Sequence, residues 1–165
     1  MNVFRFVGID FKTGPWFLLA SLLLVLPAPA LAVLGDNGAS VLTDQARMKG
    51  TLRSVDNRTY VMHEITAPTG AVVREFVSPA GAVFGVAWDG QFQPDFQQLL
   101  GPYYQQAQQA RQETSSAQQQ RLRRAPIAIE TPGLVIYQTG HMRSFHGQAY
   151  IPQLVPQGVQ ASDIR

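Results

Sequence analysis

Three runs rich in β-branched and aromatic residues, at 59–66, 71–77 and 82–88, constrain the fold of this chain most strongly. Two short separators, Pro68-Thr69-Gly70 and Pro79-Ala80-Gly81, divide them. In each separator proline presets a turn and glycine supplies a left-handed position, so we expect the chain to reverse twice and pair its strands antiparallel. The third run is apolar on both faces, which favours a central place in the sheet.

The second run also carries two charged residues on opposite faces. Because side chains alternate along a strand, Arg74 shares a face with Phe76, whereas Glu75 lies between Val73 and Val77 on the other face.

A glutamine-rich stretch over residues 91–120 predicts helix. Pro94 suits the first helical position and Asp95 favours the N-terminal end of the helix dipole. Apolar residues recur at helical spacing up to Ala107, so we expect a helix over 94–110 that Gly101-Pro102 kinks or splits. The apolar stripe does not continue through residues 108–124, so we expect these residues to form a frayed polar helix or a flexible segment. A weaker pattern predicts a short helix from Thr43 or Asp44 to Arg53.

The last third returns to strands, at 127–130, 133–137 and 142–150, with turns at 131–133 and at Thr139-Gly140. We therefore expect one α+β domain whose antiparallel β-sheet is built from two meanders, with a long helix packed on one face.

The first 32 residues have the pattern of a secretory signal peptide. Basic residues precede an apolar run at 16–26, and Ala30-Leu31-Ala32 supplies the small residues that a signal peptidase recognises. We expect cleavage after Ala32, a periplasmic or secreted protein, and a single domain over 33–165. The alternative is an uncleaved anchor, since residues 16–34 could cross a thinned bilayer.

Composition narrows the possible functions. The chain has no cysteine, which excludes disulfides, thiol catalysis and cysteine-based metal sites. Its net charge of +2 gives no electrostatic reason to expect nucleic acid as a partner. We expect the protein to contact a membrane only if its signal segment remains uncleaved. No motif calls for a cofactor.

Catalytic motifs are weak throughout. His63-Glu64 resembles the start of a zinc-protease motif, but position 67 is alanine, and on a strand these two side chains face opposite ways. No serine lies in a hydrolase motif. A small hydrolase or metal-binding site using His63, His141 and His146 with nearby carboxylates remains the alternative.

Aromatic residues gather where the third run meets the predicted helix. The favoured interpretation is that these residues pack the helix on the sheet. The functional alternative is that they form an aromatic groove that binds sugar rings or peptides. The candidate ligand-binding residues are Trp88, Asp89, Phe92, Asp95, Tyr103 and Tyr104.

Several segments resemble one exported bacterial family, known as domain of unknown function 2844. The most specific are residues 74–88 and 94–101, and the resemblance spans nearly all of 33–165. It implies a bacterial, periplasmic or secreted protein and brings no activity, cofactor or catalytic residue. From the aromatic residues at 88–104, the absence of catalytic motifs and the flexible glutamine-rich segment, we expect an exported cell-envelope protein of unknown function that is a non-catalytic binding module for a partner protein or a glycan.

Overall fold

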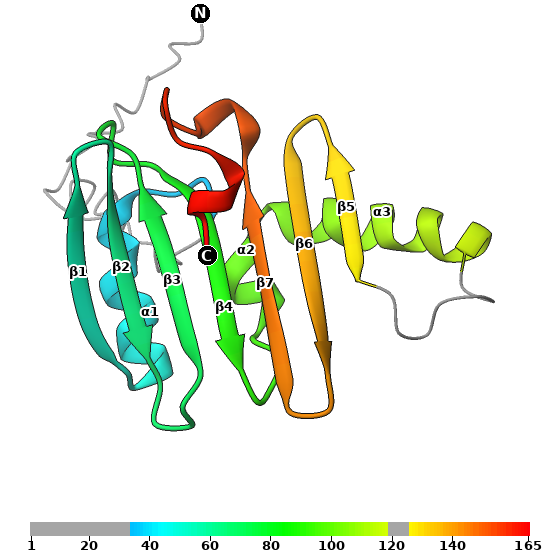
Figure 1. The fold of residues 1–165 in the computed structure, drawn as a ribbon, viewed down its shortest axis with the longest axis horizontal. Helices are drawn as coiled ribbons and strands as arrows, with labels where there is room; N and C mark the ends of the chain where they lie inside the picture. The colour runs from blue at the N-terminus through cyan, green and yellow to red at the C-terminus, as the bar shows by residue number, and fades with distance from the viewer. Residues whose placement is uncertain (1–33, 119–125) are drawn as a thin grey trace, which may run out of the picture.

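The computed structural model describes residues 34–118 and 126–165, and in it seven strands form one sheet in the order β1-β2-β3-β4-β7-β6-β5 (Figure 1). All six neighbouring pairs are antiparallel. The strands are β1 (Thr51–Asn57), β2 (Tyr60–Thr66), β3 (Val72–Val77), β4 (Val83–Gly90), β5 (Ile127–Thr131), β6 (Leu134–His141) and β7 (Ser144–Tyr150).

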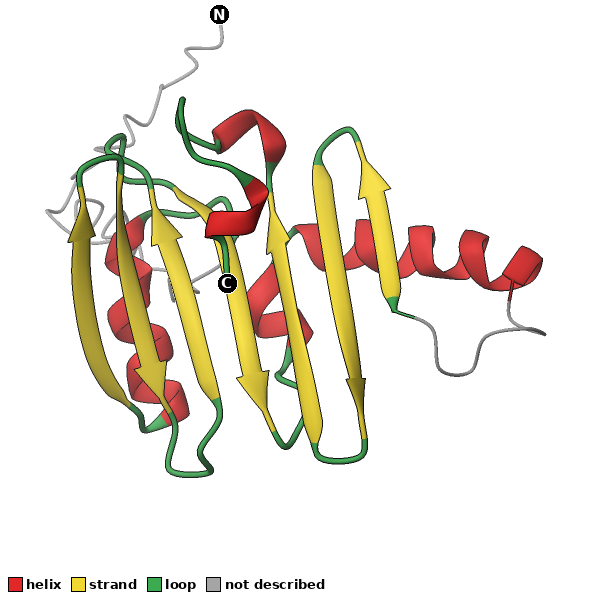
Figure 2. Ribbon diagram, viewed as in Figure 1, coloured by secondary structure: helices red, strands yellow, loops and turns green. Residues whose placement is uncertain are grey.

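Helices cover one face of the sheet, and the C-terminal segment crosses the other (Figure 2). The helix face carries α1 (Val41–Met48), α2 (Phe96–Leu100) and α3 (Tyr103–Gln118), which pack on the larger apolar cluster. On the opposite side, which we call the tail face, residues 152–165 pack on a smaller cluster around Phe76, Phe84 and Ile164. Within the described residues, no helix is long and apolar enough to span a membrane.

The three β-rich runs become β2, β3 and β4, separated by the predicted turns, and β4 is the central strand. The antiparallel sheet with helices is therefore confirmed. The long helix of the predicted fold is two helices, split at Gly101-Pro102 as the sequence predicts: α2 ends at Leu100, Gly101 has φ of 46°, and α3 begins at Tyr103. Because α3 continues to Gln118, much of the predicted polar segment is helical, while residues 119–125 lie outside the described ones.

The expected helix from Thr43 or Asp44 to Arg53 is wrong at both ends. Helix α1 runs from Val41 to Met48, and Lys49 then adopts a left-handed conformation with φ of 50°. Gly50 follows, where an added Cβ would lie 2.7 Å from Cγ2 of Ile65. This tight passage leads the chain directly into β1, a strand that the polar sequence did not reveal.

The expected turn at Thr139-Gly140 is also misplaced. Strand β6 continues through His141, and the chain reverses at Met142-Arg143, where Arg143 has φ of 64°. In this extension His141 pairs with Ser144 across the turn.

Candidate functional site

The register of the sheet brings together residues that lie far apart in the sequence. Asp89 in β4 is directly opposite His146 in β7. Two residues before Asp89, Ala87 packs in the tail-face cluster, and two residues after His146, the side chain of Gln148 donates to the carbonyl oxygen of Ala161 in the C-terminal segment. Since strand residues two apart share a face, Asp89 and His146 both lie on the tail face.

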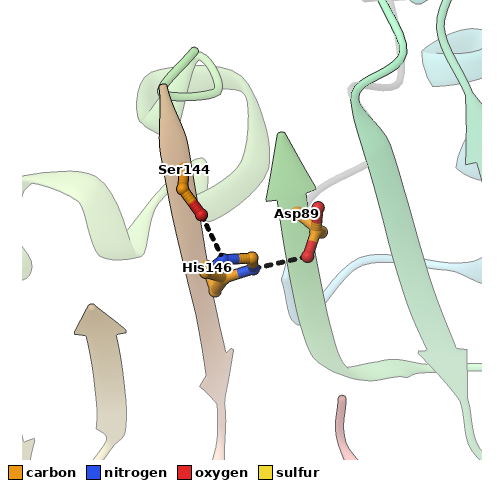
Figure 3. A network of polar contacts seen from close by, with 3 residues as sticks. All are labelled: Asp89, Ser144 and His146. Carbon is orange, nitrogen blue, oxygen red and sulfur yellow. Dashed lines mark hydrogen bonds and ion pairs between the residues drawn. The ribbon is translucent and has the colours of Figure 1, made fainter. Parts of the chain in front are cut away.

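These residues form a chain of polar contacts with Ser144 (Figure 3). Nδ1 of His146 contacts Oδ2 of Asp89, and Nε2 of the same ring lies 2.7 Å from Oγ of Ser144. When the N–H at Nδ1 donates a hydrogen bond to the carboxylate, Nε2 carries no proton and can accept the hydroxyl proton of the serine. We call Asp89, His146 and Ser144 the relay. The side chains of His146 and Asp89 are 50% and 51% exposed, so a ligand can reach them.

Two strongly exposed apolar side chains lie at the same end of the sheet. Gly90, the last residue of β4, pairs with Phe145, so the loop after β4 and the β6–β7 turn lie at one end. Phe92 in that loop is 64% exposed and Met142 in that turn is 93% exposed. We call the relay with Phe92 and Met142 the relay end.

Of the predicted aromatic site, Trp88 belongs to the core of the helix face. Its side chain is 3% exposed and meets Phe96 edge-on at 5.2 Å between ring centroids. It lies over Gly147, where an added Cβ would come within 2.3 Å of the indole. The favoured interpretation, packing of helix on sheet, is confirmed for this residue.

The other predicted residues divide into two groups. Tyr103 and Tyr104 pack against the core. The carboxylate of Asp95 caps α2 by accepting from the backbone of Gln97 and Gln98. Asp89 and Phe92, by contrast, are exposed at the relay end.

The three histidines do not gather. His63 lies on the helix face, two residues before the buried Ile65, and its Nδ1 is 2.8 Å from Oγ of Ser54. Burial lowers the pKa of His63. His141 ends β6, and its side chain lies outside the description. Within the described residues, no group of three histidine or acidic side chains is arranged to hold a metal ion.

A buried acidic pair was missed by the sequence analysis. Glu75 of β3 and Asp44 of α1 are 1% and 0% exposed. Nε2 of Gln98 donates to Oδ1 of Asp44 at 2.6 Å. Burial and the adjacent Asp44 carboxyl raise the pKa of Glu75 to about 8, and burial also raises the pKa of Asp44. Glu75 therefore keeps its proton at neutral pH. The position of Glu75 between two valines was the available signal.

Comparison with known proteins gives a family and no activity. The family model described as protein of unknown function (DUF2844) matches residues 30–164. No curated protein and no solved structure matches the chain. The resemblance seen in the sequence is thus confirmed, and the chain belongs to the DUF2844 family of proteins of unknown function.

Proposed function

We propose that this protein is an exported cell-envelope module that binds a glycan at the relay end. The relay is the observation that carries the proposal. It presents a carboxylate, an imidazole and a hydroxyl in fixed positions on a half-exposed sheet surface. The exposed ring of Phe92 lies at the same end.

Sugars match this combination of groups. Their hydroxyls both donate and accept hydrogen bonds, which suits an acceptor such as Asp89 beside the donor and acceptor atoms of His146 and Ser144. Their C–H faces pack on exposed aromatic rings such as that of Phe92. Export rests on the signal pattern of residues 1–32, which would carry the domain to the compartment where envelope glycans occur.

A titration of the purified protein with soluble cell-wall oligosaccharides, followed by NMR chemical shifts, tests this function. We expect shifts centred on β4 and β7, and at least about tenfold weaker binding for Phe92→Ala and for Asp89→Asn, the loss typical of one good contact. Leu42→Ala is the matched control, because Leu42 is also exposed, at 63%, but lies on α1 across the sheet. No shifts with any wall fragment, or equal weakening by the control, would contradict the proposal.

The alternative built on His63, His141 and His146 together loses its basis, because His63 and His146 lie on opposite faces of the sheet. His146 contacts both a carboxylate and a hydroxyl, whereas His63 contacts the hydroxyl of Ser54.

A further inference from the structure

We propose that Ser144 is a nucleophile that accepts an acyl group from an activated ester, with His146 as its base and Asp89 as the residue that positions the imidazole. This proposal stands on the geometry of the relay alone and does not depend on the binding of a glycan.

The order of contacts is the one that nucleophilic serine chemistry requires. A carboxylate contacts one ring nitrogen of the imidazole, and the other nitrogen is 2.7 Å from the serine oxygen, within the range for proton transfer. The contact with Asp89 fixes the tautomer that leaves Nε2 free to accept a proton. All three residues belong to paired strands, so the backbone holds their relative positions.

The described structure contains a second serine–histidine pair in which no carboxylate contacts the histidine. Ser54 in β1 is 2.8 Å from Nδ1 of His63 in β2. The acidic residue directly opposite His63 in the register is Glu75, but neither of its carboxyl oxygens has a hydrogen-bond partner in the described structure. The Ser54–His63 pair is thus an internal control for the contribution of the carboxylate.

The reaction balances with an ester as the sole co-reactant. Oγ of Ser144 forms a bond to the acyl carbon, and the bond from that carbon to the leaving alkoxide or phenolate oxygen breaks. The hydroxyl proton passes to Nε2 of His146 and then to the leaving oxygen, so the products are an acylated Ser144 and a free alcohol or phenol.

We expect a single acylation instead of rapid turnover. Strand backbone N–H groups are used in the ladder, so a sheet face offers few of the free donors that stabilise the oxyanion in efficient serine enzymes. An acyl group on Ser144 would therefore persist long enough to be detected by mass.

The test uses the purified protein with two probes, a fluorophosphonate and p-nitrophenyl acetate, and locates adducts by mass spectrometry of peptides. We expect Ser144 to be labelled faster than Ser54, because Ser54 has an imidazole beside it but no carboxylate that orients the ring. Ser144→Ala should remove the adduct, and His146→Gln should slow labelling of Ser144 about 100-fold, the usual contribution of a positioned general base, to below the rate of Ser54.

The role of Asp89 needs a readout that a merely structural residue would not change. Asp89→Asn should slow labelling of Ser144, and Asp89→Glu should restore part of the rate, while both variants keep the thermal midpoint of the parent. Because Asp89 and His146 are half exposed, we expect these variants to fold. Labelling of Ser144 no faster than of Ser54, or unchanged labelling in His146→Gln, would overturn the proposal.

Discussion

Glu75 is the most unusual residue of the core, because its carboxyl group is buried beside that of Asp44 and no basic side chain is paired with it in the described structure. Arg47 lowers the pKa of Asp44, but by less than burial raises it. Gln98 contributes amide hydrogen bonding but no charge. On the sheet side the neighbour of Glu75 in β2 is His63, whose own pKa is lowered by burial, so it supplies no positive charge at neutral pH. The proton on Glu75 is thus what makes the pair tolerable inside the protein.

The stability of the fold should depend on pH through this proton. The pKa of Glu75 is about 8 in the folded state and near 4.5 in the unfolded chain. Its contribution is therefore complete below pH 4.5 and is lost as pH rises toward 8, because the unfolded state releases the proton first. We expect the free energy of unfolding to fall by a few kcal/mol across this interval. Urea unfolding at a series of pH values measures it.

Glu75→Gln keeps the size of the side chain and cannot ionise, so its unfolding free energy should lose most of this pH slope. Glu64→Gln is the matched control, since Glu64 is a partly exposed strand residue paired with Arg74 at 2.8 Å. If Glu75→Gln keeps the slope of the parent, the buried pair is not its source.

At the scale of elements, the C-terminal segment acts as the cover of the tail face. It has little regular structure, with short 3-10 turns at Pro152–Leu154 and Ala161–Asp163. Its main anchor is Ile164, which is fully buried and packs directly over Gly85 of β4. Because Gly85 has no side chain, the isoleucine can approach the strand, and an added Cβ would lie only 3.1 Å from its Cδ1.

Ile164→Ala should release this cover. Truncating a buried isoleucine costs about 2–5 kcal/mol, and here the loss should appear first as local opening of residues 152–165. Hydrogen exchange should therefore speed up in this segment and at the tail-face cluster before it does in β6. Ser162→Ala, an exposed position two residues away, should change stability by no more than about 0.5 kcal/mol. Equal protection in both variants would mean that other contacts hold the segment.

Elements with a clear apolar pattern were predictable, and those defined by long-range pairing were not. Strands β2 to β4 alternate between turn signals, so their residues and order followed from the sequence. Strand β1 is polar and lies at the edge of the sheet, where an apolar face is not needed. The relay was missed because the contact between Asp89 and His146 spans 57 residues and depends on β4 pairing with β7. Ser144 has no sequence motif, and its partner His146 lies two residues further along the same strand, β7.

At the scale of the whole molecule, the first described residues are already tied to the core. Leu34 is fully buried, and its backbone N–H donates to the carbonyl oxygen of Leu99 at 3.2 Å. The next residue, Gly35, donates to the carbonyl oxygen of Val83 at 2.8 Å, which ties the start of the domain to the central strand. Cleavage after Ala32 would thus remove none of these contacts, and the family match, from residue 30 to 164, covers the same unit.

We predict that the exported protein starts at Val33, and that a chain of residues 33–165 folds with the stability of the parent. N-terminal sequencing and intact mass of protein recovered from the expressing bacterium measure the first part, and urea unfolding measures the second. Deleting residues 1–35 is the matched control: it removes the buried Leu34 and two hydrogen bonds to the core, so this chain should lose at least about 2 kcal/mol. Recovery of the full 18.1 kDa chain from the membrane fraction would show instead that the N-terminal segment stays as an anchor.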